Sequence, residues 1–254
     1  MKYEPASAFR TALEQRLLST SRETRIPLVR LRKLVAFDRL LARLKAIAPD
    51  QWILKGAVAL LFRAGPQSRT TLDIDFVRED DEERATTDFV AVQSLDLGDH
   101  FSFKIERTAR LDMTTEGAAV RYRARAELAG RPFEDVIVDV AFSESFEESA
   151  DLVRGPDLLS FADILPLEVR VLPLAQHVAE KLHAYTRIYE GARRSSRVKD
   201  PVDLAMIESL FEFRAGQLPG AIESTFLARG YPSNPNTTSS AAQRVASPLS
   251  PDGP

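Results

Sequence analysis

The stretch Trp52-Ile53-Leu54-Lys55-Gly56-Ala57 is followed, after one short helix, by Thr71-Leu72-Asp73-Ile74-Asp75-Phe76. The pattern predicts a strand, a glycine turn, a helix and a second strand. Side chains alternate between the two faces of a strand, so Asp73 and Asp75 share one face. Two adjacent carboxylates are tolerable in solvent or useful if they hold a divalent cation, and Mg²⁺ prefers oxygen ligands. The segment therefore indicates metal-assisted phosphoryl or nucleotidyl chemistry.

A third carboxylate lies in Val136-Ile137-Val138-Asp139-Val140-Ala141-Phe142, a nearly continuous apolar run that predicts a strand buried on both faces. A lone buried carboxylate costs free energy, so Asp139 needs a cation, an arginine or hydrogen-bond donors. Joining Asp73 and Asp75 at a metal would supply the cation. An ion pair with one of the many arginines is the alternative.

Composition limits the class of protein. The 254 residues are 44% hydrophobic, enough for a substantial core, and the net charge of −3 leaves only a local patch for any contact with nucleic acid. The absence of cysteine excludes disulfides and cysteine-based zinc sites, which suits a cytoplasmic protein, and three histidines make a histidine-rich metal site a poor candidate. We expect neither a signal peptide nor a membrane span.

Apolar periodicity predicts an α+β protein, with a small mixed sheet that carries helices on one side. A polar break is expected over residues 19–25, a charged turn over 78–84 and a hairpin turn at Ala129-Gly130-Arg131. The expected helices cover residues 5–18, 27–47, 57–63, 86–95, 173–189, 200–213 and 218–227, and the expected strands cover 53–54, 71–77, 101–107, 118–128 and 132–142.

The predicted organisation has four parts: N-terminal helices over residues 1–50, a core over 51–165, a helical region over 166–230 and a disordered tail over 231–254. The tail is rich in Ser, Thr, Asn, Pro and Ala and has little to bury. We expect the basic residues of the second helix to be solvated; they are Arg30, Arg32, Lys33 and Arg39.

Two blocks resemble one family. Leu54 to Leu60 followed by Arg69 to Phe76 is similar to the opening signature of the AbiEii-type nucleotidyltransferases, which include the MenT-type toxins. Glu180 to Arg187 followed by Arg197 to Leu204 is similar to the C-terminal helical motif of that family. The order and spacing of the blocks fit, and the resemblance covers roughly residues 30–230.

The resemblance implies a polymerase-β-like nucleotidyltransferase core, NTP as substrate, Mg²⁺ or Mn²⁺ as cofactor and an antitoxin partner. Several members transfer nucleotides to the 3′ end of tRNA and so stop translation. Carried over to matching positions, it implies metal ligands at Asp73, Asp75 and Asp139, catalytic roles for Asp73, Asp75, Lys181 and Asp203, and nucleotide contacts by Lys55, Gly56, Ala57, Arg69, Asp139 and Lys199. Lys181 and the acids would then face each other across a cleft.

The chain departs from related polymerase-β-like enzymes at Ala57, because many of them have Gly-Ser where this chain has Gly56-Ala57. Ala57 has no hydroxyl group that could bind a phosphate oxygen, but backbone N–H groups at the helix start remain available. We therefore expect weaker or altered triphosphate binding rather than none. The tail is a second departure, because the family usually continues with more ordered sequence.

Structural alternatives stand beside several of these roles. Asp200 followed by Pro201 is also a typical helix start, with Asp200 as N-cap. Taken alone, Lys181 would be a solvated lysine. Tyr185 and Tyr189 are expected to be core residues. Two basic sets are candidates for contacts to RNA phosphates. Arg121, Arg123 and Arg125 share one strand face, which by default is solvated, and Arg193, Arg194, Arg197 and Lys199 cluster in a loop that is the better candidate.

We therefore expect an enzyme that moves NMP from NTP to an RNA, with the tRNA 3′ end as the first choice of acceptor. Transfer to a protein hydroxyl is the alternative reaction. A catalytically weak module that binds nucleotide or a partner is the alternative from another class. Hydroxyl groups beside the predicted metal site, on Ser68, Thr70 and Thr71, are candidate targets for modification by an antitoxin.

Overall fold

The computed structural model describes residues 1–65, 68, 71, 73–111, 119–142, 150–186, 188–189, 193–194 and 199–229. The chain divides into two compact units, residues 1–172 and the residues from Pro173 onward, and each is described by itself. Arg69, Thr70 and the predicted disordered tail lie outside the described residues, so the predictions that concern them stay predictions.

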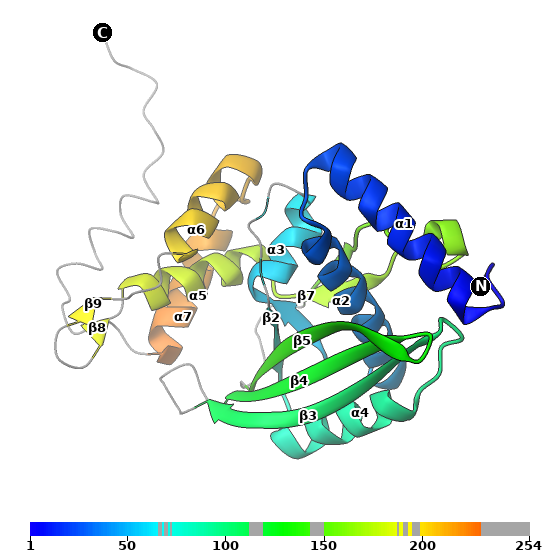
Figure 1. The fold of residues 1–254 in the computed structure, drawn as a ribbon. Helices are drawn as coiled ribbons and strands as arrows, with labels where there is room; N and C mark the ends of the chain where they lie inside the picture. The colour runs from blue at the N-terminus through cyan, green and yellow to red at the C-terminus, as the bar shows by residue number, and fades with distance from the viewer. Residues whose placement is uncertain are drawn as a thin grey trace, which may run out of the picture. The chain divides into compact units, whose positions relative to one another are not determined.

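The first unit is built on a seven-stranded mixed sheet with the order β3-β4-β5-β2-β1-β7-β6. Figure 1 shows the neighbouring strands β3, β4 and β5 in green. The central pair, β2 and β5, is parallel, as is β1 with β7, and the other neighbours are antiparallel. The strands are β1 (Ile53–Lys55), β2 (Asp73–Arg78), β3 (Phe101–Leu111), β4 (Ala119–Leu128), β5 (Arg131–Phe142), β6 (Asp151–Arg154) and β7 (Glu168–Val171).

One face of this sheet is covered by helices, as the sequence predicts. In β5, alternate residues Val136, Val138 and Val140 are fully buried in the main apolar core. The helix α2 packs against β5, and α4 packs against both α2 and β3 (Figure 1). The helices of this unit are α1 (Ala6–Thr24), α2 (Leu28–Ile47), α3 (Gly56–Ala64) and α4 (Glu82–Ser94), with a short 3₁₀ turn, η2 (Ser160–Ala162).

The other face of β5 is only half covered, which corrects the prediction of a strand buried on both faces. Ile137, Asp139 and Ala141 are of intermediate exposure, while their neighbours on the strand are buried. The apolar run is therefore a one-sided strand whose second face carries an acid. The hairpin between β4 and β5 is confirmed, and Ala129 and Gly130 both have the positive φ that a two-residue hairpin turn requires.

Some element boundaries also differ from prediction. The helix α1 continues through most of the predicted polar break to Thr24, and α4 begins at Glu82, inside the predicted charged turn, where Asp81 accepts a hydrogen bond from the Arg84 N–H as its N-cap. The strands β6 and β7 were not expected, and β7 lies in the region predicted to be helical.

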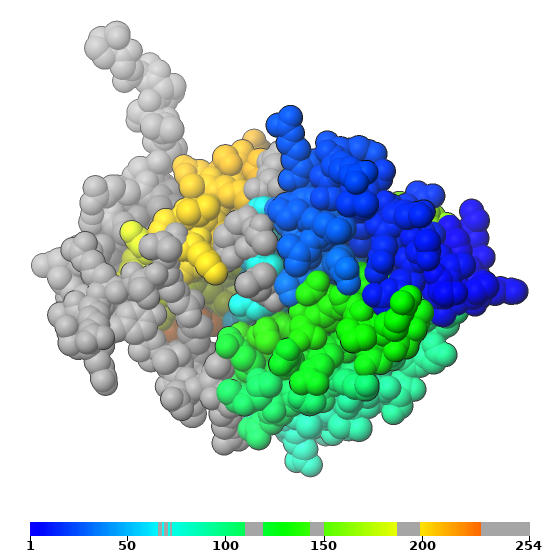
Figure 2. Space-filling view, in the orientation of Figure 1, coloured from blue at the N-terminus to red at the C-terminus, as the bar shows by residue number. Residues whose placement is uncertain are grey.

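The four basic residues of α2 that were expected to be solvated are half-buried or buried and hydrogen-bonded, which corrects a second prediction. Arg32 donates to the Phe133 carbonyl at 2.6 Å, and Lys33 donates to the Asp135 carbonyl at 2.6 Å. Arg30 donates to the Ser68 carbonyl and Arg39 is buried against Asp38. Arg32 and Lys33 thus fasten α2 to the start of β5. Figure 2 shows the N-terminal residues in blue lying directly against the green strand residues.

In the described part of the second unit there are three helices and a short hairpin. The apolar contact between α5 and α7 is made by Ala175, Ala179 and Ala221, and the Arg229–Glu180 ion pair at 2.6 Å joins the same two helices. None of the helices in the described part of the chain combines the length and the apolar run of a membrane span. The elements are α5 (Leu174–Thr186), β8 (Ile188–Tyr189), β9 (Arg193–Arg194), α6 (Lys199–Leu210) and α7 (Gln217–Arg229).

Candidate active site

The predicted carboxylates of the first unit meet on the half-open face of the sheet. Asp75 of β2 lies directly opposite Asp139 of β5 in the parallel register, and Asp73 lies two residues before Asp75 on the same face. Lys55 of β1 is the partner of Asp75 on its other side. Ile74, between the two acids on β2, is buried in the core and holds the strand in this register. The sheet thus brings three acids and one lysine together.

Gly56 joins β1 to α3 at this cluster, and its lack of a side chain is required twice. Its φ is +66°, a left-handed conformation that favours glycine. A Cβ atom on Gly56 would lie 1.9 Å from Oδ2 of Asp75, so the carboxylate occupies the space that a side chain would take. Asp75 therefore lies against the N-terminal end of α3, where a negative charge is favoured.

Replacing Gly56 by alanine is expected to destabilise the first unit more than replacing Gly98, which has a similar φ of +65° and open space around it. Gly98→Ala carries only the conformational cost of about 1 kcal/mol, whereas Gly56→Ala adds a collision of on the order of 2 kcal/mol. Urea unfolding followed by the fluorescence of Trp52, the single tryptophan, measures both. Equal losses in the two variants would contradict the close approach.

Asp139 is held by an arginine, the alternative that the sequence left open. Arg121 of β4 lies opposite Asp139 in the register; its Nε donates to Oδ1 at 2.7 Å, and its Nη2 donates to Oδ2 at 2.8 Å. The hydrogen bonds to Asp139 are the largest cause that raises the pKa of Arg121, and the charges of Asp73 and Asp75 add to it. Arg121 therefore belongs to the cluster, although the sequence placed it on a solvated face.

The donor set suits a hard divalent cation in part. Asp73 and Asp75 offer carboxylate oxygens on one face, with the Thr71 hydroxyl donating to Oδ1 of Asp73 at 2.5 Å. Within the described residues, no group of three or more His, Asp or Glu side chains is arranged to hold a metal ion. Both oxygens of Asp139 accept hydrogen bonds from Arg121, so a metal that takes Asp139 as a third carboxylate ligand would compete with this ion pair.

The predicted residues of the second unit also come together, as a buried ion-pair triad. Nζ of Lys181 donates to Oδ2 of Asp203 at 2.7 Å and to Oδ1 of Asp200 at 3.1 Å. All three residues are buried, so the solvated alternative for Lys181 is wrong. Asp200 is a member of the triad rather than the N-cap, since α6 begins one residue earlier at Lys199, and its Oδ2 has no hydrogen-bond partner among the described residues.

The other predicted residues are placed as follows. Ala57 is buried in α3, so only its backbone could face a ligand, and Lys199 is exposed at the start of α6. Tyr185 is half-exposed rather than part of the core. The side chains of Tyr189, Arg193, Arg194 and Arg197 lie outside the described part of the chain.

The arginines of β4 are paired with acids, which weakens the alternative that this face binds RNA. Arg123 pairs with Asp135 of β5, and Arg125 pairs with Glu106 of β3 at 3.3 Å. Each cation is matched by a carboxylate on a neighbouring strand. The face is a ladder of cross-strand ion pairs.

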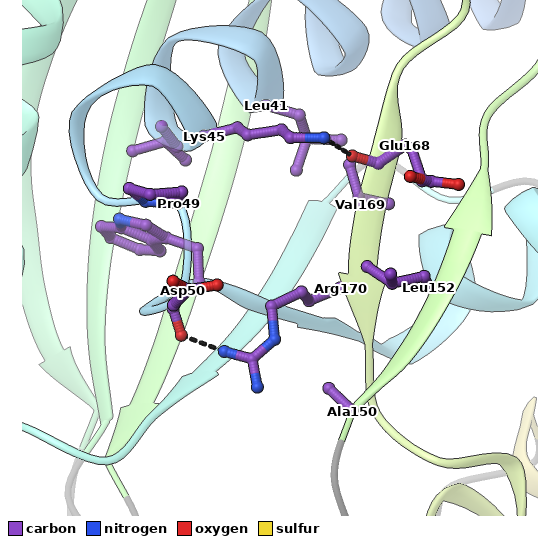
Figure 3. Close-up of a pocket in the computed structure, with 11 residues that line it drawn as sticks. Leu41, Lys45, Pro49, Asp50, Ala150, Leu152, Glu168, Val169 and Arg170 are labelled. Carbon is purple, nitrogen blue, oxygen red and sulfur yellow. Dashed lines mark hydrogen bonds between the residues drawn. The ribbon is translucent and has the colours of Figure 1, made fainter.

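A pocket of about 370 Å³ lies elsewhere on the first unit, between the C-terminal end of α2 and β7 (Figure 3). Lys45 donates to the Glu168 carbonyl at 2.6 Å and Arg170 donates to the Asp50 carbonyl, so both cations are engaged by backbone oxygens. The residues that line it include none of the described candidate residues. The chemistry of the candidate site lies on the acidic sheet face instead.

The chain is similar to solved structures, and the first of them shares its fold. MenT4, a nucleotidyltransferase toxin from Mycobacterium tuberculosis H37Rv, matches with a TM-score of 0.55 and 22% identity over 74% of this chain and 61% of its own. JHP933 from Helicobacter pylori matches with a TM-score of 0.47 and 16% identity over 84% of this chain and 89% of its own. The chain thus spans about three fifths of the length of MenT4. No curated protein sequence matches it.

The family described as "Nucleotidyl transferase AbiEii toxin, Type IV TA system" matches residues 39–251, most of the chain. The match includes the strand–glycine–helix–strand segment, the acid of β5 and the Lys181 triad, and it extends past residue 230, where the predicted resemblance ended. The resemblance of the two sequence blocks is confirmed: the chain belongs to the AbiEii family of nucleotidyltransferase toxins of type IV toxin–antitoxin systems.

Proposed function

We propose that the protein is a Mg²⁺-dependent nucleotidyltransferase that moves NMP from NTP to an RNA acceptor, with the tRNA 3′ end as the acceptor and arrest of translation as the consequence. The observation that carries this proposal is the in-register placement of Asp75 beside Asp139, with Asp73 on the same face and Gly56 at the start of α3. Membership of the AbiEii family supports the same chemistry, and an antitoxin as partner.

Each group on the sheet has a task in this reaction. Asp73 and Asp75, with Asp139 once it is released, would hold Mg²⁺, which when bound activates the attacking hydroxyl and offsets the charge of the leaving pyrophosphate. Lys55, opposite Asp75 in the sheet, supplies a positive charge that balances the acids or a phosphate. Backbone N–H groups at the start of α3 favour a phosphate oxygen.

Lys181 is proposed to contact the triphosphate, as its place in the family motif implies. Its burial with Asp200 and Asp203 gives it a structural task as well, because two buried carboxylates without a cation would repel each other. A loss of activity on replacing Lys181 therefore needs a stability measurement beside it. The proposed RNA contacts are the exposed Lys199 and the basic residues that precede it in the sequence, Arg193, Arg194 and Arg197. The arginines of β4 are less suitable because they are paired with acids.

The test is transfer of an α-labelled nucleotide. The full-length protein is incubated with each NTP in turn, Mg²⁺, total tRNA and cell protein, with and without EDTA. We expect label on tRNA with Mg²⁺ present and none with EDTA. Periodate-treated tRNA, whose 3′-terminal diol is destroyed, is the matched control and should stay unlabelled.

Three results would overturn parts of the proposal. Label on periodate-treated tRNA would move the acceptor away from the 3′ end. Label on protein alone would replace RNA by a protein hydroxyl as acceptor. No label on any acceptor, with tight nucleotide binding, would leave a binding module rather than an enzyme.

A further inference from the structure

Four charged residues form one row across four adjacent strands of the sheet. The register places Lys55, Asp75, Asp139 and Arg121 opposite one another in turn on β1, β2, β5 and β4. Two anions in the middle are thus flanked by a cation on each side. Such a row balances its own charge without any bound ion, so a divalent cation that enters it competes with a cation of the protein.

Arg121 is the competitor whose contact with an acid of the row the structure describes. Its guanidinium makes a two-pronged contact with both oxygens of Asp139, the arrangement that gives an arginine–carboxylate pair its strength and direction. The side chain of Asp139 is only 17% exposed, so little water shares these oxygens. The backbone of Arg121 is fixed as well, because the Thr108 hydroxyl donates to its carbonyl at 3.1 Å.

We propose that Arg121 is a positioning residue, which holds Asp139 in the metal-free protein and must release it before that carboxylate can join Asp73 and Asp75 as a metal ligand. The inference rests on the proposed function, since it concerns the same metal site. The released guanidinium keeps its place beside the acids and has the planar donor geometry that suits a phosphate oxygen. A metal bound to a nucleoside triphosphate offers Arg121 a phosphate oxygen as a new partner. Its entry is therefore favoured over entry of the bare metal.

Arg123 provides a matched control on the same strand. It lies two residues from Arg121 on the same face and pairs with Asp135, whose side chain is 46% exposed. Its carboxylate partner is not in the row with Asp75. Removing Arg123 deletes the same charge from the same strand but frees no predicted metal ligand.

The experiment measures binding of Mn²⁺ alone to the full-length protein by calorimetry, without nucleotide. Arg121→Met is expected to tighten Mn²⁺ binding about fivefold, the value of a well-formed pair that is partly exposed, and Arg123→Met less than about twofold. In an Asp139→Asn background, Arg121→Met should lose its advantage over Arg123→Met. Arg121→Lys, which keeps the charge but lacks the two-pronged contact, should tighten binding less than Arg121→Met does.

The outcomes separate this inference from the proposed function. If Asp75→Asn abolishes Mn²⁺ binding but the two methionine variants bind alike, the metal site stands and the role of Arg121 is wrong. That role is also wrong if the gain from Arg121→Met persists without the Asp139 carboxylate. If wild type and Asp75→Asn bind Mn²⁺ alike, the metal assignment fails and the role of Arg121 fails with it.

Discussion

Asp75→Asn is expected to lower nucleotide transfer by about 1,000-fold, equivalent to about 4 kcal/mol of transition-state stabilisation. Asp75 is one of the two acids in the middle of the row, between Lys55 and Asp139, and its Oδ2 lies at the start of α3. Asparagine keeps the shape but removes the charge that a divalent cation requires. Label transferred from NTP to RNA in single-turnover reactions measures the loss, and urea unfolding verifies that the fold persists.

Asp135→Asn is the matched control for this change. Asp135 is also an acid on the half-open face, on the strand next to Asp75, and it pairs with Arg123. We expect its replacement to change transfer by less than about twofold, because an exposed ion pair contributes little and Asp135 lies opposite Arg125 rather than opposite a predicted metal ligand. Equal losses in the two variants, or full activity in Asp75→Asn, would remove Asp75 from the catalytic site.

The sequence predicted the strands around Gly56 and the shared face of the two acids, because the alternation of side chains along a strand and a glycine turn are properties of neighbouring residues. The strands around Gly56 and the shared face of Asp73 and Asp75 are confirmed. The neighbours of these acids depend on strand order, which pairs β2 with β5 across some sixty residues of sequence and is not a local property. The sequence named Asp139 as a third acid, but it could not choose between a metal and an arginine.

The pairing of Arg121 with Asp139 was readable in principle, but it depends on a bulge. Counting from the turn, where Leu128 pairs with Arg131, would place Arg121 opposite Val138 and turn its charge toward the core. The register shifts by one between Ala126 and Glu127, and this extra residue on β5 brings arginine opposite aspartate. A prediction that paired the arginines of β4 with the acids of β5 would have had to assume this bulge.

Other errors came from reading charge as exposure. Glu82, Glu83 and Arg84 were assigned to a turn, although acids suit the first turn of a helix that Asp81 caps. The cations of α2 were assigned to solvent, although long side chains such as Arg32 reach backbone carbonyls of the sheet. The strands β6 and β7 are four residues long, too short for alternation to distinguish them from loop.

Asp99→Asn is expected to lower the free energy of unfolding of the first unit by about 3–5 kcal/mol, because it breaks a buried ion-pair network. Arg43 is fully buried; its Nη2 donates to Oδ1 of Asp99 at 2.7 Å, and its Nη1 donates to Oδ2 at 3.0 Å. Asp99 also faces Arg39, whose other partner is Asp38. Burial raises the pKa of Asp38, because the interior disfavours the charged form of this carboxyl.

The asparagine amide would also turn donor hydrogens toward the donor hydrogens of Arg43, so the network loses a hydrogen bond as well as its charge balance. Urea unfolding followed by Trp52 fluorescence reports on this unit. Glu127→Gln is the control: it removes a carboxylate from the Lys104–Glu127 pair of the same sheet, where the lysine side chain is 66% exposed, and should cost less than about 1 kcal/mol. If both variants unfold at the same urea concentration, the buried network contributes no more to stability than a surface pair does.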